Sequence, residues 1–478
     1  MNRMDRQDIL HAPELHLKGK QKDVYKLPFQ GNILVKGSAG SGKTVVAIAR
    51  ARHLRNMYED TATNIRIAFF TYDKSLRDEI RNYLNAPDFY VNNLDSWVHR
   101  FLLKRYGENL PDIFDKKDWQ FRRDIVYSVK VATFTGFDKA IAKKSAKFYL
   151  DEIEWIKGRM VETEAEYVEM QRRGRGVADR VTREDRHLLW KFKEIFDEKL
   201  RSLNCNLFAD RIILAINELK KEPLSSDELF DHVIVDEAQD FTLAKLRLIS
   251  LIAHGGTSEL KGISLFADVA QSIYESGFSW KEANIAVAGH RSFTFNNNYR
   301  NTKEIAEAAS SLMLHNEEKD DLVEMTIPER NGCKPLLIKG DKLGVELKTI
   351  IMSIPKDETC VIGVDDNKIQ KQWIDCLSKS KRYEAMSKGL SNLSHKNGKK
   401  VMHVRTFHKL KGLQFDNVIL CLWDNSWYFS SDMDKEKKRK LLYVAMTRAC
   451  KKLVICATRT PSPLVDEIDS NLLEVRNV

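Results

Sequence analysis

The chain has 478 residues, 43% of them hydrophobic and 31% charged, which is the composition of a globular protein with room for about three domains. Its 78 basic and 68 acidic residues give a net charge of +10, a mild preference for polyanionic partners. The sequence has no apolar run long enough to span a membrane, and its seven cysteines form no C-x-x-C pair. These features argue against membrane association, a zinc site and a disulfide framework, and we expect a cytoplasmic protein.

Apolar, strand-like runs alternate with helical patterns in two regions, and such alternation predicts a parallel sheet in each. The runs are NILVKG, IRIAFF, HVIVDE and GISLFAD in the first region, and KPLLIKG, TCVIGVD, VMHVRT and NVILCLW in the second. The long stretch between IRIAFF and HVIVDE has helical spacing, as in FYLDEIEWIKGRM and REDRHLLWKFKEIFDEKLRSL. The fold class is therefore α/β, with two parallel-sheet domains and a helical insertion in the first.

These patterns also predict domain boundaries. The first α/β domain comprises residues 1–105 and 206–298, the insertion residues 106–205, and the second α/β domain residues 299–478. The polar, basic stretch 378–400 is expected to be a long loop within the second domain.

The strongest local signal is GSAGSGKT, which follows the strand-like NILVK and opens the helical VVAIARARHL. This context is the one that a phosphate-binding P-loop requires. Glycines let successive backbone N–H groups turn towards a phosphate chain, the lysine adds a charge at the β- and γ-phosphates, and the threonine hydroxyl ligates Mg²⁺. The predicted nucleotide-binding residues here are Gly37, Ser38, Ala39, Gly40, Ser41, Gly42, Lys43 and Thr44.

The run VIVDEAQD, residues 233–240, ends a fully apolar strand in a cluster of acids. Open α/β sheets bind ligands outside the carboxyl ends of their strands. Beside a P-loop, Asp236 would hold Mg²⁺ together with Thr44, and Glu237 would position the attacking water. The alternative is a solvated start of a helix, where acids are also favourable. The P-loop makes hydrolysis of a nucleoside triphosphate the better reading.

Together with the P-loop, VDEAQD resembles superfamily 1 helicases of the UvrD/Rep/PcrA type. Further segments similar to that family's motifs follow in its order: KGKQKDVY, FADVAQSIY, NNYRNTKEI, RTFHKLKGLQF and LLYVAMTRA. The resemblance spans Gln21 to Leu453 and implies two RecA-like domains that use ATP and Mg²⁺.

The resemblance also implies roles for single residues. Gln271 would sense the γ-phosphate, and Arg300 and Arg448 would reach it from the second domain. Cations aimed at a transferring phosphoryl group stabilise its transition state, whereas the alternative for each arginine is a surface ion pair of little energy. The remaining nucleotide contacts implied are Gln21 at the adenine, Tyr299 stacked on the base, and Gln414, which replaces the family's ribose-binding Glu and so predicts looser sugar selectivity.

The resemblance also implies contacts to nucleic acid, because several residues at the ends of predicted β-strands match family positions that touch the bound single strand. A translocase follows that nucleic-acid strand by phosphate contacts and base stacking, so nearby aromatic residues are candidates as well. The aromatic residues are equally suited to a hydrophobic core. The family's Trp-Arg-Gly after Q-S-I-Y is replaced here by Glu275, Ser276 and Gly277. The basic run QRRGRG could meet phosphates, and KEKKRK is more typical of a solvated helix face. The candidate contacts are Thr71, Tyr72, Ser96, Trp97, Tyr274, Phe278, Thr406 and His408.

The leading hypothesis is an ATP-dependent translocase or helicase that moves 3′ to 5′ on a single strand, DNA being favoured over RNA. The direction follows from the motif Q-S-I-Y, residues 271–274, which resembles the corresponding motif in the 3′-to-5′ branch of the family. The second domain has no room for the large 2B insertion of bigger relatives, and this motivates an alternative. In that alternative the chain is an ATP-gated, nucleic-acid-sensing subunit that regulates or loads a partner protein such as a nuclease. A third hypothesis, a P-loop kinase or small-molecule ATPase, does not explain why two arginines would come from a separate domain.

Overall fold

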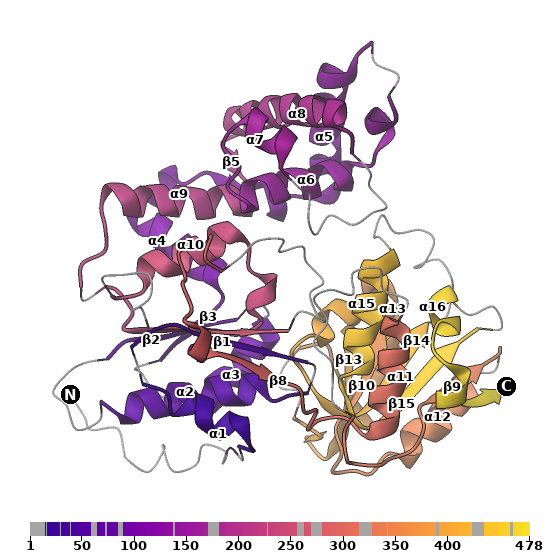
Figure 1. Cartoon of the computed structure of the whole chain (residues 1–478). Coiled ribbons are helices and arrows are strands. Elements are labelled where there is room, and N and C mark those ends of the chain that lie inside the picture. Colours follow the sequence, from indigo (N-terminus) through magenta and orange to yellow (C-terminus); the bar gives the residue numbers. More distant parts are fainter. Residues whose placement is uncertain are drawn as a thin grey trace.

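The computed structural model describes residues 15, 17–28, 30–38, 40–58, 65–71, 74–84, 89–136, 139–170, 181–226, 228–255, 262–268, 280–314, 327–341, 343–388, 392–422, 435–458 and 462–478. They form two sheet-containing lobes and a third lobe of helices that extends from the first (Figure 1). The predicted α/β class with a helical insertion is confirmed.

The first sheet has six parallel strands in the order β3-β2-β6-β7-β1-β8. Val35 and Phe69 pack on the face covered by helices α2 and α3, while their neighbours Leu34 and Phe70 pack on the opposite face with α4, α9 and α10. Burial on both faces explains why these strands read as continuous apolar runs. The strands are β1 (Ile33–Gly37), β2 (Ile67–Phe70), β3 (Phe89–Asn92), β6 (His232–Val235), β7 (Ile263–Ala267) and β8 (Ser292–Phe295).

Helices α2, α3, α4 and α10 follow the carboxyl ends of strands β1, β2, β3 and β6, so their amino termini face the same edge of the sheet. Helix α2 follows β1 through the P-loop, and α4 follows β3 with Asn93 as its cap. The helices are α1 (Lys20–Tyr25), α2 (Lys43–Asn56), α3 (Lys74–Tyr83), α4 (Leu94–Tyr106), α9 (Phe208–Lys221) and α10 (Leu243–Ile252).

The helical lobe lies between α4 and α9. A short parallel pair, β4 (Asp112–Ile113) and β5 (Cys205–Asn206), brings its two ends together. Its core is aromatic, with Tyr149, Phe192 and Phe196 fully buried between the helices. The helices are α5 (Trp119–Phe134), α6 (Ala146–Gly158), α7 (Glu164–Glu169) and α8 (Arg183–Ser202).

The second sheet has eight strands, seven of them in the order β11-β13-β10-β14-β15-β9-β16, with β12 paired to β13. The β12–β13 pair is antiparallel and the other pairs are parallel. The strands are β9 (Leu336–Lys339), β10 (Cys360–Val364), β11 (Tyr383–Met386), β12 (His395–Lys396), β13 (Lys399–Thr406), β14 (Phe415–Leu422), β15 (Ala449–Ala457) and β16 (Glu474–Asn477).

The expectation of a long loop at residues 378–400 was wrong. Strand β11 extends the sheet beside β13, and β12 forms a hairpin with the start of β13. All four residues of β11 are half-buried, as befits an edge strand. A polar edge strand lacks the apolar pattern that reveals a central strand, and its pairing with β13 gives it its conformation.

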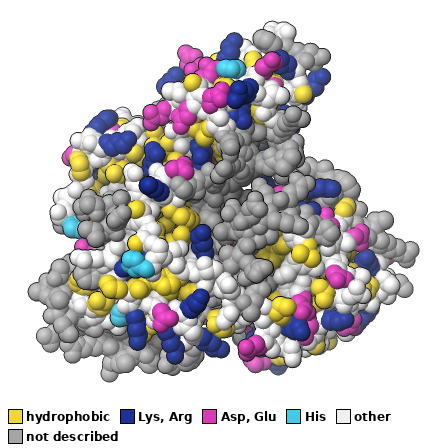
Figure 2. Space-filling model, in the orientation of Figure 1, with side chains coloured by type: hydrophobic (Ala, Val, Ile, Leu, Met, Phe, Trp, Pro, Cys, Tyr) yellow, Lys and Arg dark blue, Asp and Glu magenta, His cyan; other side chains and the backbone are white. Residues whose placement is uncertain are grey.

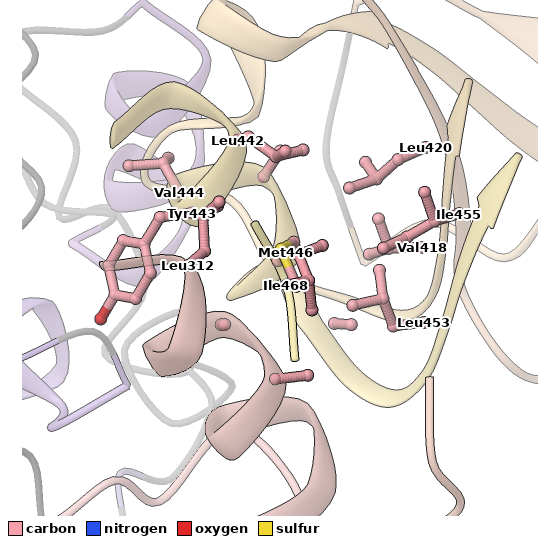
Figure 3. Packing of buried hydrophobic residues seen from close by; sticks show 14 of the residues in the cluster. Leu312, Val418, Leu420, Leu442, Tyr443, Val444, Met446, Leu453, Ile455 and Ile468 are labelled. Carbon is pink, nitrogen blue, oxygen red and sulfur yellow. The ribbon is translucent and has the colours of Figure 1, made fainter. Parts of the chain in front are cut away.

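Helices cover both faces of the second sheet. In Figure 3, Leu442 and Met446 of helix α15 lie towards Leu420 and Ile455 of the sheet, whereas Tyr443 and Val444 lie on the other side of the helix. The helices of this lobe are α11 (Lys303–Met313), α12 (Leu343–Ser353), α13 (Asn367–Ser378), α15 (Lys435–Met446) and α16 (Pro463–Asp466). Among the described residues, no helix has both the length and the hydropathy needed to cross a membrane.

Candidate active site

The P-loop, residues 37–44, joins the end of β1 to the start of α2. Gly40 and Gly42 have φ angles of +77° and +83°, a left-handed conformation that costs glycine little and other residues more. A Cβ at Gly42 would collide with the Gln21 side chain, and one at Gly40 would collide with Asn298. Backbone conformation and close packing therefore both require glycine at these two positions.

Two hydroxyl groups in the same loop fit a phosphate ligand. The side-chain oxygens of Ser38 and Ser41 are buried and have no hydrogen-bond partner within the described part of the chain. A buried hydroxyl without a partner is costly, and a bound phosphate oxygen would satisfy it. Ala39, the remaining predicted loop residue, lies outside the described residues.

Lys43 is buried, and its ammonium group points back into the loop. The Nζ atom donates to the carbonyl oxygens of Gly37 and Ser38 at 2.7 and 2.8 Å and lies 3.1 Å from Oδ2 of Asp268. Asp268 directly follows β7, the neighbour of β1 in the sheet. The charge of Lys43 is thus held where the P-loop would cradle a phosphate chain.

Thr44 and Asp236 come together although 192 residues separate them. The Thr44 hydroxyl donates to Oδ2 of Asp236 at 2.7 Å. Burial, and then the neighbouring Glu237, raise the pKa of Asp236 to about 7. A divalent cation would offset both effects, and a hydroxyl next to a carboxylate is an oxygen donor set that suits Mg²⁺. These two residues therefore fit the predicted metal site.

Glu237 has an unusual backbone. Its φ of 54° and ψ of 42° lie in the left-handed region, although it carries a side chain. Such a conformation costs energy and persists at sites where function requires it. Its side chain accepts a hydrogen bond of 2.5 Å from Nε2 of Gln239, and Oε1 of Gln239 accepts one of 2.8 Å from the backbone N–H of Asp268. Gln239 thereby fixes Glu237 relative to the tip of β7.

The charges around Glu237 favour its ionised form. Burial alone would raise its pKa, but Lys411, Lys43 and Arg448 outweigh this effect and lower the pKa. A carboxylate that stays ionised can accept a hydrogen bond from a water molecule, as the role predicted for Glu237 requires.

Gln21 lies in helix α1 directly against the P-loop. Its Nε2 donates to the carbonyl oxygen of Ser41 at 2.8 Å, and its Oε1 accepts a hydrogen bond of 2.8 Å from the backbone N–H of Lys18. Lys18 also places its Nζ 5.5 Å from the ring centre of Tyr299, which is 41% exposed. Gln21 and Tyr299, the two residues predicted to meet the base, therefore lie on the same side of the loop.

Arg448 approaches the site from the second α/β unit, and Arg300 approaches it from the segment that leads into that unit. The Nε and Nη1 atoms of Arg300 are buried without a hydrogen-bond partner in the described structure. Arg448 is fully buried and donates from Nε to the carbonyl oxygen of Val444 at 2.8 Å and from Nη2 to the Thr447 hydroxyl at 3.2 Å. Burial, and then Arg300, lower the pKa of Arg448 to about 9, so it remains charged at neutral pH.

A buried ion pair joins the two α/β units at this site. Nζ of Lys411, from the β13–β14 connection, lies 2.5 Å from Oδ2 of Asp240, the last acid of VDEAQD. Burial raises the pKa of Asp240 to about 6, although Lys411 opposes the shift. In the next position, Gly412 packs against Leu76 of helix α3. The RTFHKLKGLQF segment therefore contacts the acids of the first unit directly.

The sequence analysis named Thr406 and His408 of this segment as nucleic-acid contacts and did not indicate this role for Lys411. Asp268 and Gln239 were also missed as site residues. Asp268 carried a usable signal, because it follows an apolar strand just as Asp236 does. Gln414, predicted to meet the ribose, lies within RTFHKLKGLQF and is exposed.

The residues predicted to contact nucleic acid differ in their exposure to solvent. Thr71 and Thr406 are buried, whereas His408 is exposed. Ser96 lies in the first turn of α4, and Trp97 packs on the core and stacks on Phe101 with ring centres 5.2 Å apart. Outside the described residues lie Tyr72, the run QRRGRG, Gln271, Tyr274 and Phe278.

The surface carries both signs of charge. Figure 2 shows basic and acidic side chains interspersed over the visible face. The expectation that KEKKRK forms a solvated helix face was partly wrong, because Lys438 and Arg439 are buried. Arg439 pairs with Glu467 through two hydrogen bonds, of 2.6 and 3.1 Å.

Comparisons with known proteins agree along most of the chain. The family model of the UvrD/REP helicase N-terminal domain matches residues 17–293, and that of the UvrD-like helicase C-terminal domain matches residues 364–460. A probable DNA helicase of Mycoplasma pneumoniae is 23% identical over 476 residues, covering 91% of this chain and 82% of that protein.

Two further relatives are longer proteins. DNA helicase II of Haemophilus influenzae is 24% identical over 63% of this chain and 41% of its own length. ATP-dependent DNA helicase PcrA of Leuconostoc citreum is 24% identical over 66% of this chain and 40% of its own length. The matched region is thus less than half of either relative.

Proposed function

The chain belongs to the UvrD/REP helicase family, and we propose that it is an ATP-driven motor that moves 3′ to 5′ on single-stranded DNA. Its family makes it an ATP-hydrolysing enzyme of the DNA helicase class. The observation that carries the motor proposal is the meeting of two α/β units at one site. Lys43, Asp236 and Glu237 come from the first unit, and Arg448 and Lys411 from the second.

Each of these residues has a distinct part in the proposed reaction. The P-loop amides and Lys43 bind the β- and γ-phosphates, and Glu237 orients the attacking water. Thr44 and Asp236 would hold Mg²⁺, which supplies positive charge to the phosphate oxygens when it is bound. Arg300 and Arg448 complete the positive surround of the γ-phosphate when the two units close on the nucleotide.

Closure would couple ATP to movement along a strand. Thr71 and Ser96 belong to the first unit and Thr406 and His408 to the second, so a change in the distance between units would change the spacing of strand contacts. The 3′-to-5′ direction rests on the resemblance of residues 271–274 to that branch of the family. A cytoplasmic location follows from the same proposal.

We expect single-stranded DNA to raise the steady-state ATPase rate of the purified chain severalfold, with a smaller effect of single-stranded RNA and duplex. The measurement is phosphate release with each nucleic acid, beside a Lys43→Ala control. Strand displacement on a 3′-tailed and a 5′-tailed duplex then tests direction. A rate that is indifferent to all nucleic acids would contradict the motor. ATPase stimulation without displacement would instead favour a subunit that regulates a partner such as a nuclease.

Arg448→Ala should lower turnover by about a thousandfold, because a phosphate-contacting arginine contributes that much or more in related chemistry. ATP affinity should change little, since the P-loop and Gln21 remain. The measurements are kcat and equilibrium binding of a fluorescent ATP analogue. Normal turnover in this variant would overturn the closure mechanism.

Arg439→Ala is the matched control for this prediction. Arg439 is also a buried arginine of the α15 region, but its partner is Glu467 rather than the site. We expect this variant to lose stability in thermal unfolding while keeping its turnover.

A further inference from the structure

The segment that connects the two α/β units, residues 296–302, touches the P-loop. It runs from the end of β8 to the start of α11. The backbone N–H of Tyr299 donates to the carbonyl oxygen of Gly40 at 2.9 Å, and Asn298 fills the space where Gly40 would carry a side chain. A displacement of the P-loop at Gly40 must therefore reach this connecting segment.

Two buried asparagines give the connecting segment a fixed shape. Oδ1 of Asn298 accepts hydrogen bonds from the backbone N–H groups of Arg300 and Asn301, at 2.9 and 3.1 Å. Nδ2 of Asn298 donates to Oδ1 of Asn301 at 2.8 Å. The exposed fractions are 6% for Asn298 and 1% for Asn301. These bonds orient the carboxamide of Asn301 and leave its nitrogen facing away from Asn298.

The side-chain nitrogen of Asn301 faces the backbone on both sides of Arg448. Nδ2 of Asn301 donates to the carbonyl oxygens of Thr447 at 3.1 Å and of Ala449 at 2.6 Å. Both hydrogens of the amide are used, so the two bonds set the position and the orientation of the Arg448 peptide together. A single bond to either carbonyl would still let the turn rotate.

We propose that Asn298 and Asn301 form a positioning relay that transmits the position of the P-loop to Arg448. The relay runs from Gly40 through Asn298 and Asn301 to the peptide groups that flank Arg448. It rests on the proposed function, in which Arg448 meets the γ-phosphate. Neither asparagine contacts the phosphates in this proposal, and both act by placing the arginine.

Asn301→Asp is the sharpest test of the relay. The change keeps the size of the side chain but places an oxygen opposite two carbonyl oxygens, so the bonds at Thr447 and Ala449 are lost. We expect kcat to fall by up to about a hundredfold, the effect of a misplacement of roughly 1 Å. KM for ATP should stay close to its original value, because the P-loop and Gln21 are unchanged. An unchanged kcat in the folded variant would refute the relay.

A double-mutant cycle separates positioning from a merely structural role. If Asn301 acts through Arg448, adding Asn301→Asp to Arg448→Ala should not lower kcat further. A structural role would give the same loss of kcat in both backgrounds, and this additive result would overturn the relay. Normal turnover of Arg448→Ala alone would instead overturn the proposed function.

Two more variants keep the test decisive. If Asn301→Asp does not fold, Asn298→Asp takes its place as the test. This change keeps the oxygen that accepts from the two backbone N–H groups but removes the N–H that donates to Asn301, so it should also lower kcat. Asn417→Ala is the matched control. Asn417 is a buried asparagine of the second sheet that donates to Glu358 at 2.8 Å and to the Thr359 carbonyl at 3.3 Å. It should lower the melting temperature and leave kcat unchanged; an equal fall of kcat in this control would refute the relay.

Discussion

Replacing Lys43 with alanine will abolish ATP hydrolysis, with a fall in turnover of at least about a hundredfold. The ammonium group of Lys43 is held by two carbonyl oxygens of the P-loop and by Asp268. This position puts a fixed positive charge where the β- and γ-phosphates would bind, so its loss removes both ground-state binding and transition-state stabilisation. Arginine should not replace it, because a planar guanidinium does not fit a buried site shaped for an ammonium group.

The measurement is steady-state phosphate release at saturating single-stranded DNA, for wild type, Lys43→Ala and Lys43→Arg. Lys104→Ala is the control, since Lys104 is 78% exposed and its ion pair with Glu228 should contribute little. Lys43→Ala removes an ion-pair partner of the buried Asp268, so thermal unfolding is measured to establish that each variant is folded. A folded Lys43→Ala protein with normal turnover would refute the assignment of the nucleotide site.

Glu237→Gln should let the protein bind ATP tightly while lowering turnover by roughly a hundredfold to ten-thousandfold, the range for loss of a catalytic base. The glutamine has the same shape and can still accept the hydrogen bond from Gln239 through its amide oxygen. It has no negative charge with which to take a proton from water. Binding should survive, because Lys43 and the P-loop remain in place.

Single-turnover hydrolysis and equilibrium binding of radiolabelled ATP distinguish these two effects. Glu222→Gln is the control, because Glu222 is 78% exposed and pairs with Arg105 on the surface. Loss of ATP binding in Glu237→Gln, with turnover otherwise near normal per bound nucleotide, would assign Glu237 to binding rather than to the chemical step.

Several features could be predicted from the sequence because they depend on neighbouring residues. An apolar run before the P-loop predicted strand β1, and an apolar run before a cluster of acids predicted strand β6. Parallel strands of one sheet bring their carboxyl ends to the same edge of that sheet. Thr44 and Asp236 therefore meet as expected, at 2.7 Å. The α/β class and the family are confirmed, whereas the roles of single residues stay predictions until the variants are measured.

Other features could not be read in this way. Strand β11 is polar and half-buried, and its strand conformation depends on pairing with β13. In the run KEKKRK, Arg439 is buried because Glu467 lies opposite it. The local sequence specifies neither partner.

The sequence by itself determined the α/β architecture, the P-loop and the acids at the strand tips, since each follows from a short pattern of residue types. The tertiary structure alone decided that Lys411 pairs with Asp240 and that Asn301 bonds on both sides of Arg448. These contacts join residues 171, 146 and 148 positions apart. The Lys411–Asp240 pair exists only when the two α/β units come together, and the Asn301 bonds join the start of the second unit to the turn between α15 and β15. No local periodicity encodes contacts between segments so far apart in the chain.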